Sequence, residues 1–219
     1  MNAWKLWGQL SAGLLIAAVC VLPATADELI FYPTDDTFVD EWAPNNVWGA
    51  SSGLRVRNTG NGPWECDSLV KFDVTSIPPG TPIPSATLHL YYFAWQDSNP
   101  AGRPLRCRRV TSDWDEETVT WNTRPGWSSV ITDAVPVPGS YGWMEWDVTE
   151  DVQAFVDGTA TDYGWVIRDE TYWGGADIPF MRFYSKEYGE FTPYLEVVPE
   201  PSTLALLLLG SLAVLSRRR

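Results

Sequence analysis

Basic residues are scarce in this sequence. Its 219 residues include 15 lysines and arginines against 28 aspartates and glutamates, which gives a net charge of −13. Binding to the phosphates of nucleic acids requires a basic surface, so we exclude nucleic acid as a partner. The negative charge suits a protein that stays soluble outside the cell.

Histidine and cysteine are nearly absent as well. His89 is the only histidine, and the chain has three cysteines. This set serves zinc poorly and offers no Ser-His-Asp arrangement. Carboxylates are abundant, but nothing singles out the pair that a glycosidase needs across a cleft. The sequence therefore predicts a protein without catalytic activity, in which His89 makes a hydrogen bond to a facing strand.

No hydrophobic run is long enough for a comfortable membrane span, which needs about 20 residues. The two apolar runs cover only residues 10–22 and 203–215. The first run follows Lys5 and precedes Ala24-Thr25-Ala26, a pattern typical of a signal peptide cleaved after Ala26. We therefore expect export across the inner membrane through the Sec machinery.

The second apolar run lies between Pro199-Glu200-Pro201 and three terminal arginines. Arginines beside an apolar segment favour the cytoplasmic side, so the preceding domain faces outward. This order of parts resembles the PEP-CTERM sorting signal, and the resemblance implies processing by an exosortase. An ordinary tail anchor is the alternative. We expect a transient membrane anchor and a final place at the cell surface or outside the cell.

One domain, residues 27–197, remains between the signal peptide, 1–26, and the sorting segment, 198–219. Without Lys5, the three terminal arginines and Glu200, the domain keeps 11 basic and 27 acidic residues, a net charge of −16. Its length suffices for a sizeable core. Neither an internal repeat nor a linker divides it.

Short runs of β-branched and aromatic residues alternate with Gly, Pro, Asn and Asp clusters, and helical periodicity is nearly absent. Residues 149–157 are the exception: Thr149 begins a short helix and Gly158 ends it. The pattern predicts an all-β jelly-roll sandwich with this helix over its end, flanked by an N-terminal signal helix and a C-terminal apolar helix. Ten strands are expected, at 29–32, 53–58, 67–73, 85–94, 104–111, 129–133, 143–148, 163–169, 180–185 and 193–197.

Two cysteines, Cys66 and Cys107, belong to the exported domain. An oxidising compartment permits a disulfide between them. Closing a loop of about 40 residues would stabilise the fold by roughly 4 kcal/mol. Two separate buried thiols account for the pair equally simply, and the sequence leaves both alternatives open.

Strand alternation sorts some side chains by face. In residues 180–185, Met181 and Phe183 oppose Phe180, Arg182 and Tyr184. Large aromatic residues thus occupy both faces of this strand. The pattern indicates an outer side that is sheltered or faces a ligand.

Five segments in order resemble the DNRLRE domain over about residues 35–197: DTFVDEWAPNNVWGASSGLRVRN, SLVKFDVTSIPPGTPIPSATLHLYYF, VTSDWDEETVTWNTRP, MEWDVTEDVQAFVDG with YGWVIRDE, and FYSKEYGEFTPYLEV. The polar residues of that family match Asp36, Asn46, Arg55, Arg57 and Glu187. The closing motif reads Ser-Lys-Glu instead of Ser-Arg-Glu, which loses the planar fork of arginine. The resemblance implies a jelly roll related to carbohydrate-binding modules.

Tryptophan is unusually frequent, with 13 in the chain. Four lie in strand motifs and are expected in the core: Trp114, Trp121, Trp146 and Trp165. Four others lie in predicted loops, where flat sugar faces can stack on them: Trp42, Trp48, Trp95 and Trp173.

Several arginines fall within predicted strands, and their forks suit the carboxylates of uronic acids. They either form a positive strip that selects an anionic polysaccharide or pair with the surplus of Asp and Glu. The six are Arg55, Arg57, Arg106, Arg108, Arg168 and Arg182. In residues 53–58, Leu54 and Val56 face the core and the two arginines face outward.

The ligand-binding candidates combine the family positions with these rings and cations: Asn46, Trp48, Arg55, Arg57, Trp95, Trp173, Arg182, Lys186 and Glu187. Asp35, Asp36 and Asp40 are candidate ligands for a structural calcium ion, although no EF-hand spacing is present. No other cofactor is expected.

The sequence thus predicts an exported, exosortase-processed surface or matrix protein that binds an extracellular or envelope polysaccharide without catalysis. A structural matrix protein without sugar binding is the alternative. A polysaccharide-degrading enzyme is a remote one.

Overall fold

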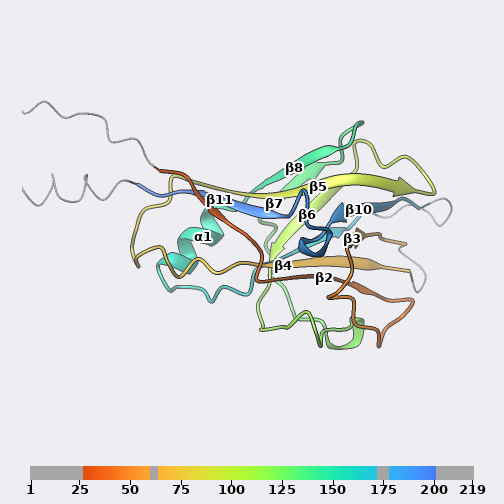
Figure 1. The fold of residues 1–219 in the computed structure, drawn as a ribbon, viewed down its shortest axis with the longest axis horizontal. Coiled ribbons are helices and arrows are strands. Elements are labelled where there is room, and N and C mark those ends of the chain that lie inside the picture. Colours follow the sequence, from red (N-terminus) through yellow and green to blue (C-terminus); the bar gives the residue numbers. More distant parts are fainter. Residues whose placement is uncertain (1–26, 60–63, 172–177, 201–219) are drawn as a thin grey trace, which may run out of the picture.

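A computed structural model describes residues 27–59, 64–171 and 178–200. This part of the chain folds into two antiparallel sheets that pack face to face, as Figure 1 shows. The prediction of an all-β sandwich is confirmed. The expected signal helix and C-terminal apolar helix lie outside the described residues.

The first sheet has the order β1-β11-β5-β10-β3, and β8 pairs with β5. Its central strand, β5, is long enough to pair with β11, β10 and β8. The strands are β1 (Leu29–Phe31), β3 (Gly53–Val56), β5 (Ser85–Gln96), β8 (Gly142–Asp147), β10 (Phe180–Tyr184) and β11 (Tyr194–Val198).

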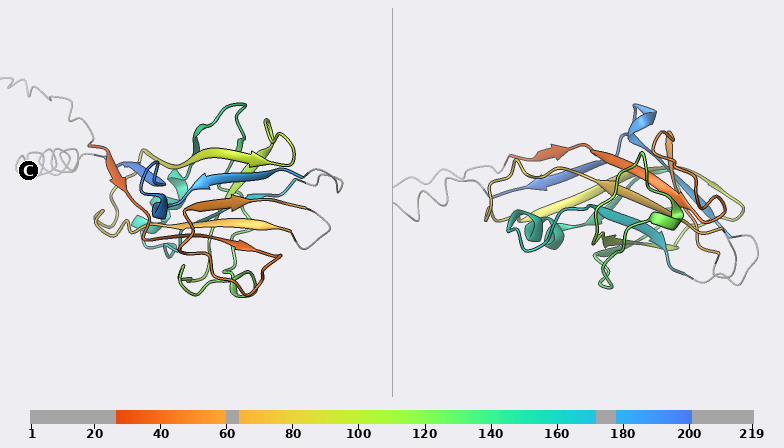
Figure 2. Two further views of the ribbon diagram at one scale, coloured as in Figure 1. Left: turned by 45° about the vertical axis from the view of Figure 1, so that its right-hand side comes forward. Right: turned by 90° about the horizontal axis from the view of Figure 1, so that it is seen from below.

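The second sheet has the order β2-β4-β9-β6-β7. Its strands are β2 (Asp35–Asp40), β4 (Cys66–Lys71), β6 (Pro104–Arg109), β7 (Asp133–Pro136) and β9 (Trp165–Asp169). A bridge between Arg57 and Cys66 connects the β3 edge of the first sheet to β4 of the second. The sandwich is therefore partly closed on this side, and Figure 2 gives two further views of the arrangement.

The main core fills the space between the sheets and contains large, fully buried side chains such as Trp146, Trp165 and Phe183. A second cluster covers the outer side of the second sheet, where Val39, Leu69 and Val166 meet Trp114 and Trp121. Strand β4 is consequently buried on both faces. All four tryptophans that the sequence assigned to the core are buried.

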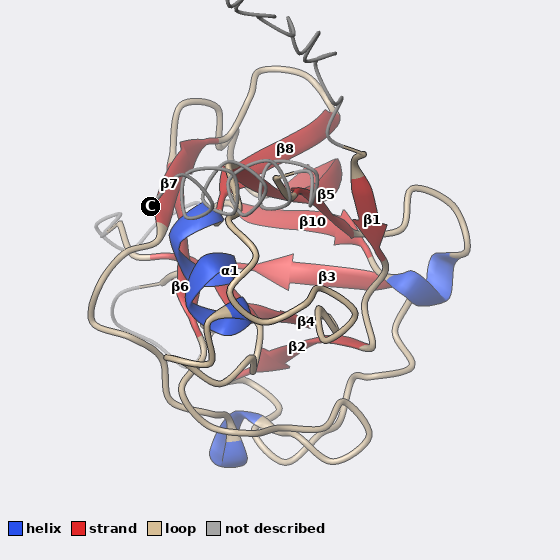
Figure 3. Cartoon of the chain, turned by 90° about the vertical axis from the view of Figure 1, so that its left-hand side faces the viewer, coloured by secondary structure: helices blue, strands red, loops and turns tan. Residues whose placement is uncertain are grey.

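The short helix α1 (Thr149–Val156) lies over one end of the sandwich, the end from which residues 27 and 200 lead to the termini (Figure 3). The prediction of a helix that begins at Thr149 is confirmed, but the threonine is not its N-cap. Val148 is the N-cap and makes no side-chain cap bond, while the Thr149 hydroxyl accepts a hydrogen bond from the Ala86 backbone at 2.9 Å. Gly158 follows in the left-handed region, with φ +68°.

Two strand predictions were wrong. Residues 35–40 form β2, which was not predicted. Three aspartates and a threonine leave it only two apolar residues, yet four of its six residues are buried. The strand expected at 129–133 begins only at Asp133, as β7. Two short 3-10 turns, η1 (Trp121–Thr123) and η2 (Lys186–Tyr188), complete the described elements.

The structure corrects the disulfide alternative. Cys66 and Cys107 are both free and buried. They lie on β4 and β6, and β9 runs between these strands and pairs with both. Burial raises the pKa of both thiols, so they behave as small apolar core residues.

Candidate functional site

A cleft of about 300 Å³ opens where β3, β10, the end of β5 and the loop after β2 meet. Strand alternation places its central cations, because Leu54 and Val56 enter the core and Arg55 therefore points outward. We call this hollow the arginine cleft. Its lining consists of Asp40, Trp42, Arg55, Arg57, Trp64, Cys66, Gln96, Asp97 and Phe180.

Arg55 lies among aromatic rings, and Asp40 is the carboxylate of the same cleft that acts on it through its charge. Its guanidinium carbon is 4.5 Å from the centre of the Phe38 ring, 5.6 Å from that of Trp48 and 5.5 Å from that of Phe180. Within residues 27–59, 64–171 and 178–200 it forms no ion pair. Arg182 is its direct partner across the β3–β10 ladder. Burial, and next the positive charge of Arg182, lower the pKa of Arg55.

Two tryptophans form a stacked pair at the mouth of the arginine cleft. The ring centres of Trp42 and Trp64 are 4.1 Å apart with 11° between their planes. Their exposed fractions are 59% and 41%. Arg57 lies 5.8 Å above the Trp64 ring and pairs at 3.1 Å with Asp97. The mouth thus offers flat apolar rings beside a cation.

A second hollow of about 310 Å³ adjoins the arginine cleft and shares Arg55 with it. Arg182 and three stacked rings line this hollow: Phe93 lies 4.1 Å from Tyr184, and Tyr184 lies 3.9 Å from Tyr188. The prediction that both faces of β10 carry aromatic side chains is confirmed. The two hollows place cations between two sets of rings on the outer face of the first sheet.

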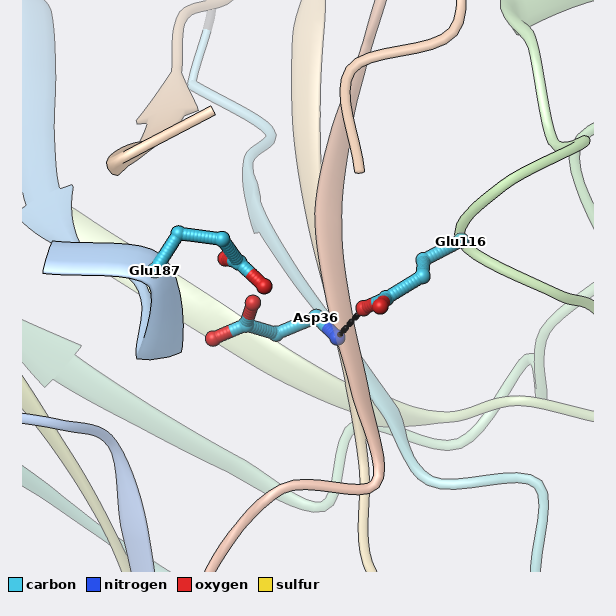
Figure 4. Close-up of side chains that lie close together, drawn as sticks. All are labelled: Asp36, Glu116 and Glu187. Carbon is cyan, nitrogen blue, oxygen red and sulfur yellow. Dashed lines mark hydrogen bonds between the residues drawn. The ribbon is translucent and has the colours of Figure 1, made fainter. Parts of the chain in front are cut away.

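Three carboxylates gather at a separate place, where η2 meets β2. Asp36, Glu116 and Glu187 each offer an oxygen within 4.8 Å of the others. Figure 4 shows the carboxylates of Asp36 and Glu187 facing one another, with Glu116 bonded to the Asp36 backbone N–H at 2.8 Å. Lys186 donates to both oxygens of Glu116 at 2.5 Å. We call this set the carboxylate cluster.

Burial dominates the electrostatics of Asp36. It raises the pKa of this fully buried carboxyl to about 8, and repulsion from Glu187 acts in the same direction. The backbone N–H of Lys186 donates to Asp36 at 2.9 Å and opposes the rise. Asp36 is therefore largely protonated at neutral pH. The oxygens are close enough to share one cation.

Comparison with known proteins now identifies the domain. The model of carbohydrate-binding module family 96 matches residues 28–199. The chain belongs to this family. A model of the PEP-CTERM protein-sorting motif matches residues 197–219, so the module is exported, transiently anchored and processed by an exosortase to reach the cell surface. No match was found among curated proteins. The DNRLRE name stays a prediction compatible with the match.

No helix among the residues that the structure describes is long and apolar enough to cross a membrane. The sorting motif itself begins at β11 of the module. Of the expected processing residues, Pro199 and Glu200 are described, and the Glu200 backbone N–H donates to Pro82 at 2.9 Å. Ala24, Ala26 and Pro201 lie outside the described residues.

The remaining strand arginines of the module do not join the arginine cleft. Arg106 and Arg108 both bond to Glu170, and the bonds from Arg108 lower the pKa of that carboxyl to about 2. Arg168 bonds to Asp67 and Glu65 at 2.8 and 2.9 Å. Four of the six strand arginines thus pair with carboxylates, because Arg57 pairs with Asp97. Arg55 and Arg182 form no ion pair within the described residues and are direct ladder partners.

Three other predicted ligand residues can be placed. Asn46 is on an exposed turn. Trp48 is half-buried, stacks on Phe38 at 5.1 Å and is one of the rings around Arg55. Trp95 pairs with the core residue Met181, because the ladder between β5 and β10 shifts by one residue between Arg182 and Phe183, and it remains 38% exposed. Trp173 lies outside the described residues.

Lys186 and Glu187 belong to the carboxylate cluster instead of the arginine cleft. The calcium ligands expected from sequence also separate: Asp35 forms an ion pair with Lys71 at 3.2 Å, and Asp40 accepts from the Trp42 backbone. Asp35 and Asp36 are adjacent in a strand and point to opposite faces.

Sequence reasoning missed Trp64, Phe180 and Glu116 as site residues. Trp64 follows the residues Gly-Asn-Gly-Pro in the sequence, a composition that meets the same loop criterion that singled out Trp42. Phe180 was placed on the outer face of its strand but was not connected with Arg55. Glu116 comes from a loop 80 residues away from Asp36, and no local pattern joins them.

Proposed function

We propose that the protein binds an anionic polysaccharide, one with uronic acid units, in the arginine cleft, and that it does so without catalysis at the cell surface or in the extracellular matrix. The observation that carries the proposal is Arg55. Its guanidinium lies against aromatic rings and beside another arginine, and within the described residues it forms no ion pair, although Asp40 lines the same cleft. A sugar carboxylate would supply the missing countercharge.

The chemistry of the cleft fits such a ligand. Guanidinium groups bind carboxylates through two parallel hydrogen bonds, and within the described residues neither Arg55 nor Arg182 forms an ion pair. The stacked pair of Trp42 and Trp64 offers an apolar surface for a pyranose face. The volume of about 300 Å³ is at the lower end of ordinary ligand pockets, which suits a few sugar units of a longer chain.

We further propose that calcium, the cofactor expected from sequence, binds at the carboxylate cluster and not at Asp35, Asp36 and Asp40. Calcium prefers several carboxylate oxygens, which Asp36, Glu116 and Glu187 supply together. The ion competes with the proton on Asp36 and with the ammonium of Lys186. Its role would be to connect η2 with β2, at a distance from the sugar.

The proposed mature protein begins after Ala26 and ends near residue 197. The N-terminal boundary rests on the signal pattern, and the C-terminal one on the sorting motif, which starts at residue 197. Mass spectrometry of the protein from cells without exosortase should find the full-length C-terminus. The same trimmed C-terminus in those cells would rule this route out.

Charge-matched variants test the sugar site. Arg55→Gln with Arg57→Gln should weaken uronate binding at least tenfold and leave the fold unchanged by circular dichroism. Arg106→Gln with Arg109→Gln removes the same charge from the second sheet and should leave binding within about twofold, since long-range attraction is screened by salt. Equal losses in both double variants would reduce the effect to net charge and contradict a specific cleft.

A further inference from the structure

The outer face of the first sheet carries a second cluster of rings, toward β8 and β11. Trp143 is the ladder partner of Tyr91, and His89 lies between Tyr194 and Glu145 in the next row. Glu196 follows two residues after Tyr194 on the same face of β11. We call this area the acidic ring surface, with Tyr91, Trp143, Glu145, Tyr194 and Glu196 as its members. Strand β10 separates it from Arg55 on β3.

The rings of this surface meet edge to face and leave part of their area open. Trp143 lies 5.2 Å from Tyr91 and 5.0 Å from Tyr194, with interplanar angles of 88° and 76°. The Tyr194 ring stacks on His89 at 4.1 Å. Trp143 remains 37% exposed. Tyr91 also packs against Phe191 at 4.3 Å, so the exposed Trp143, which stands at nearly a right angle to Tyr91 and Tyr194, offers the open ring area for a cationic group.

The charge of this surface is negative and uncompensated. Glu145 and Glu196 lie beside His89, and within the described ranges neither forms an ion pair with an arginine or a lysine. Glu28 adds a third negative charge nearby. Glu145 is 62% exposed along its side chain and so accessible to a ligand.

His89 does not neutralise the carboxylates. It is 5% exposed, and its two ring nitrogens lie 3.7 Å from Glu145 and 3.5 Å from Glu196, beyond hydrogen-bond distance. Neither nitrogen has a hydrogen-bond partner in the described part of the chain, which corrects the expected bond to a facing strand. Burial lowers the pKa of His89, and the nearby carboxylates only partly oppose this, so the ring is neutral at neutral pH.

We propose that the acidic ring surface binds a glycan that carries protonated amino sugars with free amines. An ammonium group would donate charge-assisted hydrogen bonds to Glu145 and Glu196 and lie against the faces of Trp143 and Tyr194. A uronate would be repelled here. A neutral sugar would stack but would leave both carboxylates without a countercharge. The proposal goes beyond the uronate site, and it makes this one sheet face able to connect two polymers of opposite charge.

Isothermal titration of the exported protein with glucosamine oligomers tests the proposal, with N-acetylglucosamine oligomers of equal length as the ligand control. We expect saturable binding of the free-amine oligomers and binding at least tenfold weaker after acetylation, which corresponds to about 1.4 kcal/mol. Equal binding of both oligomers, or of neither, would overturn the proposal. This comparison uses the wild-type protein alone, so its result does not depend on whether a variant folds.

Variants then locate the site. Glu145→Gln with Glu196→Gln should weaken the free-amine oligomers at least tenfold and leave uronate binding unchanged, whereas Arg55→Gln with Arg57→Gln should do the reverse. Glu117→Gln with Glu150→Gln removes the same charge elsewhere and should have little effect. A control variant that lost as much affinity for the free-amine oligomers as Glu145→Gln with Glu196→Gln would overturn the proposal. So would a dimer in sedimentation that Trp143→Ala dissociates, because a second copy would then cover the surface.

Discussion

The carboxylate cluster makes the stability of the fold depend on pH in a direction opposite to that of most acidic residues. Burial raises the pKa of Asp36 from 3.8 to about 8, so the folded state holds a proton that the unfolded state has released between these values. Stability from this group is fully present below about pH 4, falls as the pH rises, and is lost above about pH 8. Without calcium, the protein should therefore become less stable across this window.

The size of the effect follows from the shift. One pK unit corresponds to about 1.4 kcal/mol, so the full change would be about 6 kcal/mol. Hydration of the ionised Asp36 and Glu187 and movement of the Glu187 side chain reduce this loss of stability. We expect a loss of about 2 kcal/mol. For a domain of this size that lowers the melting temperature by roughly 4 to 8 °C.

Thermal unfolding of wild type and Asp36→Asn at about pH 6 and about pH 9, with chelator, measures this contribution. The asparagine keeps an acceptor for the Lys186 backbone and carries no charge at either pH. Asp162 and Asp169, whose pKa values burial raises to about 6, are common to both proteins and cancel in the difference. The variant should gain stability relative to wild type as the pH rises. A stability difference between variant and wild type that does not change with pH would refute the claim that Asp36 is buried and protonated.

Calcium supplies the second arm, because it binds ionised carboxylates and so competes with the proton. Added calcium should raise the melting temperature of wild type more at the higher pH than at the lower one, and it should not stabilise Asp36→Asn. Wild type that is indifferent to calcium at both pH values would exclude the ion from this cluster and leave the pH effect intact.

Three further predictions concern single residues. Arg55→Lys should keep the charge but lose the planar fork, so uronate affinity should fall about tenfold by titration, and an unchanged affinity would argue against bidentate contact. Trp146→Ala should destabilise the fold by about 3 to 5 kcal/mol in denaturant unfolding, since this side chain is fully buried; a loss below about 1 kcal/mol would contradict its place in the core. Thiol titration of the denatured, unreduced exported protein should find two free thiols, and none would restore the Cys66–Cys107 disulfide.

Local sequence patterns predicted most of the strands and the helix. Strands with strict alternation, such as 53–56 and 85–91, were placed correctly and on the correct faces, because one side enters the core and the other does not. Strand β2 was not predicted because some of its buried residues are polar. The carboxylate cluster and the loop that follows β6 bury them, and the sequence of the strand itself gives no sign of these contacts. Helix α1 was recognisable by spacing, but its start depended on a hydrogen bond between Thr149 and a strand 63 residues away.

The candidate site was harder to predict because it too depends on contacts between segments that are far apart in the sequence. That Arg55 and Arg57 face outward follows from alternation, whereas their separation from Arg168 depends on which sheet each strand joins. Trp95 was expected in a loop but belongs to β5, and a shifted register in the β5–β10 ladder places it opposite Met181, while it stays 38% exposed. The assembly of Asp36 with Glu116 and Glu187 required the tertiary fold, although the resemblance had singled out two of the three.

The most direct test of the account is titration of the exported protein with a polyuronate and with a neutral polysaccharide of similar length, in wild type and in Arg55→Gln with Arg57→Gln. We predict saturable binding of the polyuronate to wild type, weakened by salt, with at least a tenfold loss in the variant. Wild type that binds neither polymer, or a variant that binds the polyuronate as tightly as wild type, would contradict a sugar site at the arginine cleft.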